Sequence, residues 1–165
     1  MIKVLFVCLG NICRSPTAHA VLQQMVGQQG LQDKIVVDSC GTGSWHIGNP
    51  PDKRMQQVAL QHGYDLSGLH ARKLTAEDFD TYDYILGMDT RNVADILKKM
   101  PAHYSGKVAL LLDYSSDKNV LEVPDPYYGG EEGFERVLHL IEMACTGLLS
   151  ELSYSRTPRS STSPD

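Results

Sequence analysis

The stretch Ile2–Ala18 reads IKVLFVCLGNICRSPTA and decides the fold class. Its first seven residues, Ile2–Cys8, form a nearly continuous apolar run, which predicts a strand buried on both faces, as in parallel sheets. After a short loop, Ser15 and Pro16 are residue types favoured at a helix N-cap and at the first helical position. Apolar residues then recur at helical spacing as far as Val26. The stretch therefore predicts a strand, a loop and a helix, the first half of a βαβ unit.

The same alternation recurs along the rest of the chain. Further strands are predicted at 34–39, 82–88 and 108–112, and further helices at 52–62, at 90–100 after an Asp89 cap, and at 131–152. This pattern predicts the α/β fold class: a three-layer doubly wound sheet of four parallel strands in the flavodoxin-like order 2-1-3-4, with helices on both faces. We expect one domain over residues 1–152 and a disordered Ser- and Pro-rich tail over 153–165.

Composition narrows the function classes. With 165 residues, of which 42% are hydrophobic and 21% charged, the chain suits one compact domain. The formal net charge of -5 argues against nucleic acid as a partner. No apolar run approaches the roughly 20 residues that span a bilayer, and no signal-peptide pattern is present, so we expect a cytoplasmic protein without membrane insertion. Four cysteines without a C-x-x-C pair predict reduced thiols and no structural zinc.

The loop after the first strand carries the chemistry. Cys8 ends the strand, and Arg14 follows six positions later, directly before the predicted helix. A loop of this length can aim its backbone N–H groups at one oxyanion, and the helix N-terminus adds partial positive charge. Gly10 permits unusual backbone angles, and Arg14 can hold two phosphate oxygens. The same field stabilises a thiolate, so we expect Cys8 to be a nucleophile, although alone it would suit a buried strand cysteine. The predicted phosphate-binding loop comprises Leu9, Gly10, Asn11, Ile12, Cys13 and Ser15.

Asp125 begins a second motif, Asp125-Pro126-Tyr127-Tyr128. A carboxylic acid held over the loop could protonate a leaving phenolate and then take a proton from the attacking water. Taken alone, an Asp-Pro pair more often starts a turn. Together with Cys8 and Arg14, the catalytic interpretation is favoured.

The C-x5-R-S motif of Cys8–Ser15 and the Asp-Pro-Tyr motif at Asp125 resemble the low-molecular-weight protein tyrosine phosphatase family over about residues 1–152. The resemblance implies hydrolysis of phosphotyrosine monoesters through a phosphocysteine on Cys8, with Asp125 as general acid and base. It implies no cofactor and no metal. The expected partners are phosphotyrosine-containing proteins, with tyrosine kinases among the candidates, and we expect a monomer.

The resemblance also implies supporting roles. Asn11 would bond to Ser39 and hold the loop in shape, the Ser15 hydroxyl would point at the nucleophile, and His70 would help to fix Asn11. The side chains that would wall the substrate cleft are Ile12, Trp45, Tyr127 and Tyr128. Trp45 lies outside any periodic apolar face, which favours the cleft over the core.

Cys13 lies five residues after Cys8, so a curled loop could bring the two sulfurs within reach of a disulfide. A role in reversible oxidation is one hypothesis for Cys13, and a small buried filler is the equally weighted alternative.

Two other functions remain open. An arsenate reductase of the related fold shares the anion loop but relays oxidation through further cysteines, and the corresponding region, Tyr82–Met100, contains none. A flavodoxin-like electron carrier or phosphate-binding module could hold a flavin phosphate at the same first loop, and flavin absorbance would reveal it.

Overall fold

The computed structural model describes residues 1–126 and 130–156. The strands are β1 Ile2–Cys8, β2 Ile35–Gly41, β3 Tyr84–Gly87 and β4 Lys107–Leu110. The helices are α1 Arg14–Gln28, α2 Lys53–Gln61, α3 Asp78–Thr81, α4 Thr90–Lys99 and α5 Glu131–Arg156, with a 3-10 turn η1 at Leu111–Tyr114. Within these residues, no helix is long and apolar enough to cross a membrane.

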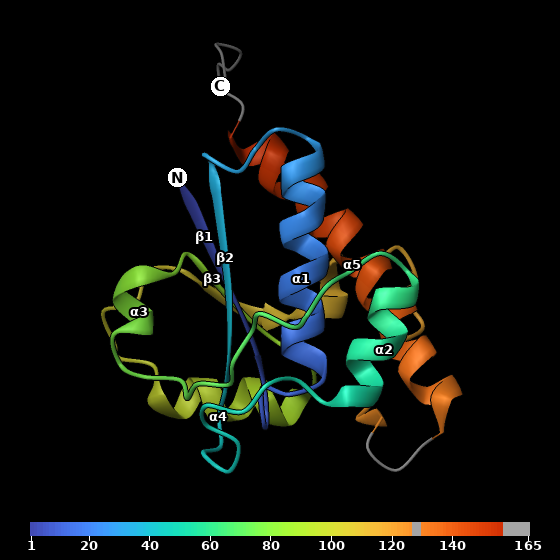
Figure 1. Cartoon of the computed structure of the whole chain (residues 1–165). Coiled ribbons are helices and arrows are strands. Elements are labelled where there is room, and N and C mark those ends of the chain that lie inside the picture. Colours follow the sequence, from blue (N-terminus) through green and yellow to red (C-terminus); the bar gives the residue numbers. More distant parts are fainter. Residues whose placement is uncertain (127–129, 157–165) are drawn as a thin grey trace.

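The four strands form one parallel sheet in the order β2-β1-β3-β4, which confirms the predicted topology. Helices α1 and α5 cover one face of the sheet, and α3 and α4 lie on the other (Figure 1). The register aligns Cys8 with Gly41 of β2 and Val7 with Gly87 of β3. The carboxyl ends of β2, β1 and β3 therefore reach the same edge, the lower edge in Figure 1, where the loops carrying the predicted site emerge.

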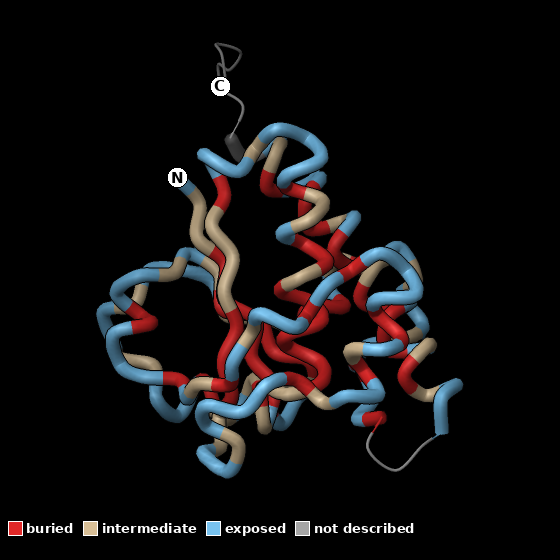
Figure 2. The backbone as a smooth tube through the Cα atoms, in the orientation of Figure 1, coloured by how far each residue is buried: buried red, intermediate tan, exposed pale blue. Residues whose placement is uncertain are grey.

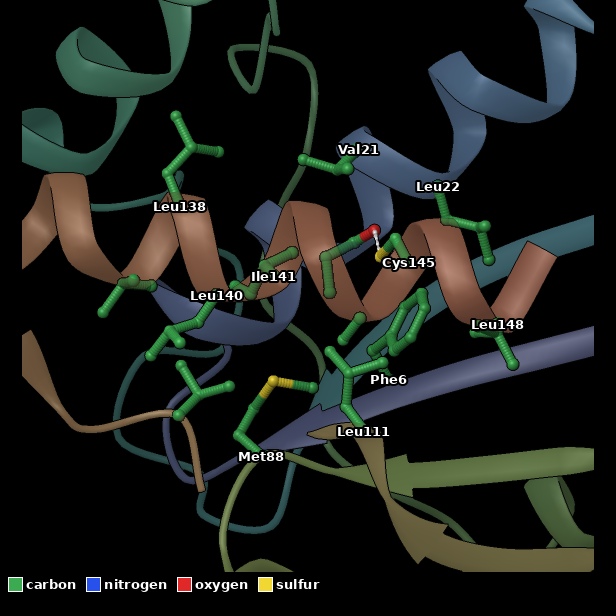
Figure 3. Close-up of a cluster of buried hydrophobic side chains, with 14 of the residues drawn as sticks. Phe6, Val21, Leu22, Met88, Leu111, Leu138, Leu140, Ile141, Cys145 and Leu148 are labelled. Carbon is green, nitrogen blue, oxygen red and sulfur yellow. Dashed lines mark hydrogen bonds between the residues drawn. The ribbon is translucent and has the colours of Figure 1, made fainter. Parts of the chain in front are cut away.

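The side chains of β1 alternate between two cores, because successive residues of a strand point to opposite faces. Phe6 packs with residues of α1 and α5, including Leu22, Ile141 and Leu148 (Figure 3). On the opposite face, Leu5 and Val7 join a smaller cluster with side chains from α3 and α4. Figure 2 shows the lower parts of β1 and β2 buried and the connections beyond their lower ends more exposed. The site edge is thus anchored on a rigid, doubly covered strand.

The start of α1 differs from its prediction. The helix begins at Arg14 with Cys13 at the N-cap, whereas Ser15 and Pro16 were expected at the cap and the first position. Ser15 does not cap the helix because its hydroxyl is engaged with Cys8 and Asn11. Pro16 still lies in the first turn, where its missing N–H would have no helical acceptor.

The last helix runs past the predicted domain boundary at residue 152 and ends at Arg156. Leu152 is fully buried, and the next helix-breaking residue along the sequence is Pro158. Residues 157–165 of the predicted tail lie outside the described residues. The fourth strand is shorter than predicted, because Leu111 and Leu112 turn into η1.

Candidate active site

The segment 8–15, here called the anion loop, folds back from the end of β1 to the start of α1. Asn11 has φ of 57°, the left-handed conformation that non-glycine residues seldom adopt. The loop lies close against β2, where a Cβ on Gly41 would stand 2.7 Å from the carbonyl oxygen of Leu9. Backbone bonds from Thr42 N to Cys8 O and from Gly43 N to Leu9 O, each 2.9 Å, join the loop to the segment after β2.

Hydrogen-bond donors surround the Cys8 sulfur. The Asn11 backbone N–H donates to Cys8 Sγ at 3.2 Å, and the Ser15 hydroxyl lies 3.0 Å from the same atom. Asn11 Nδ2 donates to Ser15 Oγ at 2.8 Å, so the Ser15 proton is directed elsewhere, toward Cys8 Sγ or toward the Cys40 carbonyl at 3.3 Å. Donors in these positions favour negative charge on the sulfur of Cys8, a residue that is only 3% exposed.

Arg14 is held by two acceptors from distant parts of the chain. Its Nη1 donates to Asp89 Oδ2 at 2.7 Å and to the Val123 carbonyl at 3.0 Å. Burial lowers the pKa of Arg14, but the negative charge of Cys8 and the hydrogen bond to Asp89 outweigh it and raise the pKa above the usual arginine value. The guanidinium is therefore a fixed positive charge beside the thiol.

A cavity of about 260 Å³ opens above Cys8 and Arg14. It is lined by Cys8, Leu9, Gly10, Ile12, Cys13, Arg14, Trp45, His46 and Asp125. The structure thus brings together the predicted nucleophile, clamp and general acid with two of the predicted cleft residues. Trp45 is 71% exposed, so it forms part of the rim and not of the core. Tyr127 and Tyr128 lie outside the described residues.

The contacts that hold Asn11 differ from those predicted. Within the described part of the chain, Asn11 and Ser39 are not bonded, and Ser39 Oγ instead lies 3.0 Å from His19 Nδ1. His70 is exposed, and the Asn11 side-chain oxygen accepts from the backbone N–H of Arg72 at 3.0 Å. The reason is local pairing: Gly41 N donates to Arg72 O, which brings the backbone of Arg72 beside the loop.

Besides His46, which lines the cavity, two residues that sequence reasoning did not assign to the site emerge here. Asp89, predicted only as the cap of α4, also binds Arg14. The side chain of Arg72 binds both Asp38 and Asp78, which ties the segment supporting Asn11 to the sheet. Burial lowers the pKa of Arg72, yet the bonds to Asp78 and the nearby negative charges raise it overall. The contacts of Arg14 with Asp89 and of Arg72 with Asp38 join residues 75 and 34 positions apart, so no local sequence pattern indicates them.

Cys13 is a buried thiol that also lines the cavity. Burial and the nearby charges of Asp52 and Cys8 raise the pKa of Cys13 to about 12. Cys13 is therefore protonated at neutral pH. Among residues 1–126 and 130–156, no group of three His, Cys, Asp or Glu side chains could hold a metal ion.

Comparison with known proteins defines the class to which this fold and loop belong. A family model described as low molecular weight phosphotyrosine protein phosphatase matches residues 3–157. A low molecular weight protein-tyrosine-phosphatase of Bacillus subtilis is 43% identical over 152 residues, which are 92% of this chain and 96% of that protein. The chain therefore belongs to the low molecular weight phosphotyrosine protein phosphatase family.

Solved structures give the same result. A protein tyrosine phosphatase from Entamoeba histolytica matches with a TM-score of 0.90 and 41% identity, covering 95% of this chain and 100% of that chain. A Drosophila protein described as an arginine phosphatase matches with a TM-score of 0.85 and 34% identity, covering 99% and 100%. The fold is thus shared by proteins whose names refer to different phosphorylated residues.

Proposed function

We propose that this protein hydrolyses phosphotyrosine monoesters in proteins through a phosphocysteine intermediate on Cys8. The observation that carries the proposal is the surroundings of the Cys8 sulfur. A backbone N–H from Asn11 and the hydroxyl of Ser15 contact the sulfur, at the floor of a cavity that Arg14 and Asp125 also line. A cysteine sulfur with hydrogen-bond donors around it, a fixed cation and a carboxyl group in one cavity are the parts that phosphoryl transfer to cysteine requires.

The reaction has two steps. Cys8 Sγ attacks phosphorus, the bond from phosphorus to the tyrosine oxygen breaks, and that oxygen takes the proton of Asp125. The Asp125 carboxylate then takes a proton from water, whose oxygen attacks phosphorus, and the bond between sulfur and phosphorus breaks. Inorganic phosphate and the Cys8 thiolate result. Arg14 and the backbone N–H groups of the anion loop bind the phosphoryl oxygens in both steps.

The walls of the cavity favour an aromatic leaving group. Leu9, Ile12 and Trp45 supply apolar surface between the rim and the sulfur. A phenyl ring can pack against these side chains, whereas phosphoserine offers little apolar surface and is shorter. Phosphoarginine is the second candidate substrate, because a structural relative is described as an arginine phosphatase. The polar N–H groups of a guanidinium would find no hydrogen-bond acceptor on this apolar wall, so phosphotyrosine is favoured.

The test compares three peptides that differ only in carrying phosphotyrosine, phosphoserine or phosphoarginine at one position. The expected result is release of phosphate at high kcat/KM from the phosphotyrosine peptide alone, and loss of that release in Cys8→Ser. Preferred hydrolysis of phosphoarginine would overturn the substrate assignment. Activity that EDTA removes and a specific divalent ion restores would overturn the assignment of charge stabilisation to Arg14 and the loop.

The chemistry of Cys8 also bears on where the protein acts and on how its activity responds to oxidation. The Cys8 thiolate needs a reducing compartment to stay active, so we propose that the protein acts in the cytoplasm. We also propose that it acts as a monomer on phosphotyrosine proteins, with tyrosine kinases among them.

Peroxide would oxidise Cys8 to a sulfenic acid, and Cys13, which lines the same cavity, could condense with it to a disulfide that cytosolic thiols reduce. The activity would then be redox-sensitive and recoverable.

A further inference from the structure

His46 lies at the catalytic cavity, next in sequence to Trp45 of the rim. Its ring packs on the backbone of the anion loop: a Cβ built on Gly10 would lie 3.0 Å from Cδ2 of His46 and 3.7 Å from Nε2. The ring is partly buried and lines the same cavity as Cys8 and Asp125. The missing side chain at Gly10 therefore lets an imidazole lie directly against the loop that would bind the phosphoryl group.

The backbone around His46 is held in place. Its carbonyl oxygen accepts from Asn49 N at 2.8 Å, and Gly48 N donates to Ala71 O at 2.8 Å. Earlier in the same segment, Gly43 N donates to Leu9 O of the anion loop at 2.9 Å. Because these bonds fix the turn before any ligand arrives, a contact made by His46 costs little ordering of the backbone.

Within residues 1–126 and 130–156, the His46 ring has no hydrogen-bond or ion-pair partner. Three other histidines do: His19 contacts Ser39, His62 contacts Glu135 and His103 contacts Asp80. Among the described residues, none forms a hydrogen bond or an ion pair with the His46 ring. His70 and His139 also lack such partners there, but both are exposed and neither lines the cavity. In the part of the chain that the structure describes, His46 is thus an unpaired imidazole beside the reacting groups.

The charges facing His46 give it a distinct role. Cys8 and Asp125 are the acidic groups that line the cavity with it, and Cys13 stays protonated at neutral pH. Among the described lining residues, only Arg14 and His46 can carry positive charge. Arg14 is buried and bound to Asp89, in position to meet the phosphoryl group. His46 is therefore the residue that could offer positive charge to a substrate atom other than those of the phosphoryl group.

We infer that His46 selects phosphotyrosine substrates with a carboxylate side chain directly beside the phosphotyrosine. The inference rests on the proposed function, since a phosphotyrosyl residue in the cavity brings its neighbours to the rim. An imidazolium donates a charge-assisted hydrogen bond to a carboxylate. The formal net charge of the protein is -5, so its overall field does not attract acidic substrates. A preference for them must come from a local cation such as His46.

The experiment uses phosphotyrosine peptides with Glu or Gln directly before or directly after the phosphotyrosine. The measured quantity is the ratio of kcat/KM for the Glu peptide to that for its Gln counterpart, at pH 5.5 and pH 7.5. Titration of the phosphate group cancels in this ratio. The proteins are the wild type, His46→Gln, His46→Arg and the matched control His70→Gln, which changes an exposed histidine outside the cavity.

We expect a wild-type ratio of about two to five for at least one of the two positions at pH 5.5, in line with exposed ion pairs, and no larger ratio at pH 7.5. His46→Gln should give a ratio near one at both pH values, whereas His46→Arg should keep the preference at pH 7.5 and His70→Gln should match the wild type. Equal ratios in the wild type and His46→Gln would overturn the inference alone. Failure of the wild type to hydrolyse any of the peptides would overturn the proposed function and this inference with it.

Discussion

The Arg14 guanidinium donates to the Asp89 carboxylate across 2.7 Å, and the other oxygen of the same carboxylate caps α4 by accepting from Asn92 N at 2.8 Å. Asp89, which follows the end of β3, therefore connects that strand to the clamp at the start of α1. It holds the guanidinium in one orientation before substrate binds. The hydrogen bonds from Arg14 to the phosphoryl oxygens are therefore correctly directed when the substrate arrives.

Asp89→Asn separates the two roles of this carboxylate. Asparagine still caps a helix, so the urea midpoint should fall only through the loss of the bond to Arg14 and not through loss of the cap. The charged bond to Arg14 is lost, and kcat/KM for a phosphotyrosine peptide should fall by about tenfold or more, since hydrogen bonds to charged groups contribute about 1.5 to 3 kcal/mol. Glu122→Gln is the control, because Glu122 binds Thr90 at the same helix start without touching Arg14. Equal losses in both variants would point to the helix and not to the clamp.

Asn11 combines a left-handed backbone with two side-chain bonds, and two substitutions distinguish these features. Asn11→Ala should lower the free energy of unfolding for two reasons. The left-handed conformation costs alanine roughly 1–2 kcal/mol, and the bonds to Ser15 and Arg72 are lost. Asn11→Gly removes the same bonds but tolerates the backbone. We expect urea unfolding to show Gly more stable than Ala, while both lose kcat. A glycine variant with wild-type kcat would mean that the side-chain bonds are dispensable.

Trp45 depends on the absence of a side chain at Gly43, since the nearest indole carbon occupies the space of a Cβ there. Gly43→Ala should displace the indole and reduce the preference for aryl over alkyl phosphates by several-fold, because the aromatic wall moves away from the substrate. The exposed neighbour Ser44→Ala should leave that preference unchanged. The ratio of kcat/KM for phenyl phosphate to that for an alkyl phosphate measures it, and an unchanged ratio in Gly43→Ala would remove Trp45 from substrate selection.

The pKa of Cys13 governs the rate of the proposed disulfide. A thiol must lose its proton to attack a sulfenic acid, and with a pKa of about 12 its thiolate fraction rises about tenfold per pH unit through the neutral range. Protein treated with peroxide should therefore form the Cys8–Cys13 disulfide faster as the pH rises from 7 to 9. Mass spectrometry of alkylated samples follows the linkage. Cys13→Ser should recover activity poorly after the same treatment, and equal recovery in both proteins would leave Cys13 as a packing residue.

The sequence predicted the sheet well because each strand and helix has its own pattern. Two of these signals are local: the apolar run Ile2–Cys8 followed by a helix, and the helix cap at Asp89. The structure confirms both. The support of Asn11 was predicted wrongly, because the bond comes from the backbone of Arg72, which any residue type could supply. The contact between Asp89 and Arg14 was missed since it joins residues 75 positions apart. Contacts between side chains at the sheet edge depend on the tertiary structure, so the local sequence pattern does not predict them.

The central claim is that phosphate passes through Cys8. Asp125→Ala should slow hydrolysis of the intermediate, because no carboxylate activates the attacking water. Rapid acid quenching after mixing this variant with p-nitrophenyl phosphate, whose acidic phenol leaves without a proton from Asp125, followed by mass spectrometry, should find a phosphoryl group on the peptide that contains Cys8. Cys8→Ser introduced into the same variant should lack it. A phosphoryl group on another residue, or turnover that persists in Cys8→Ser, would contradict the account.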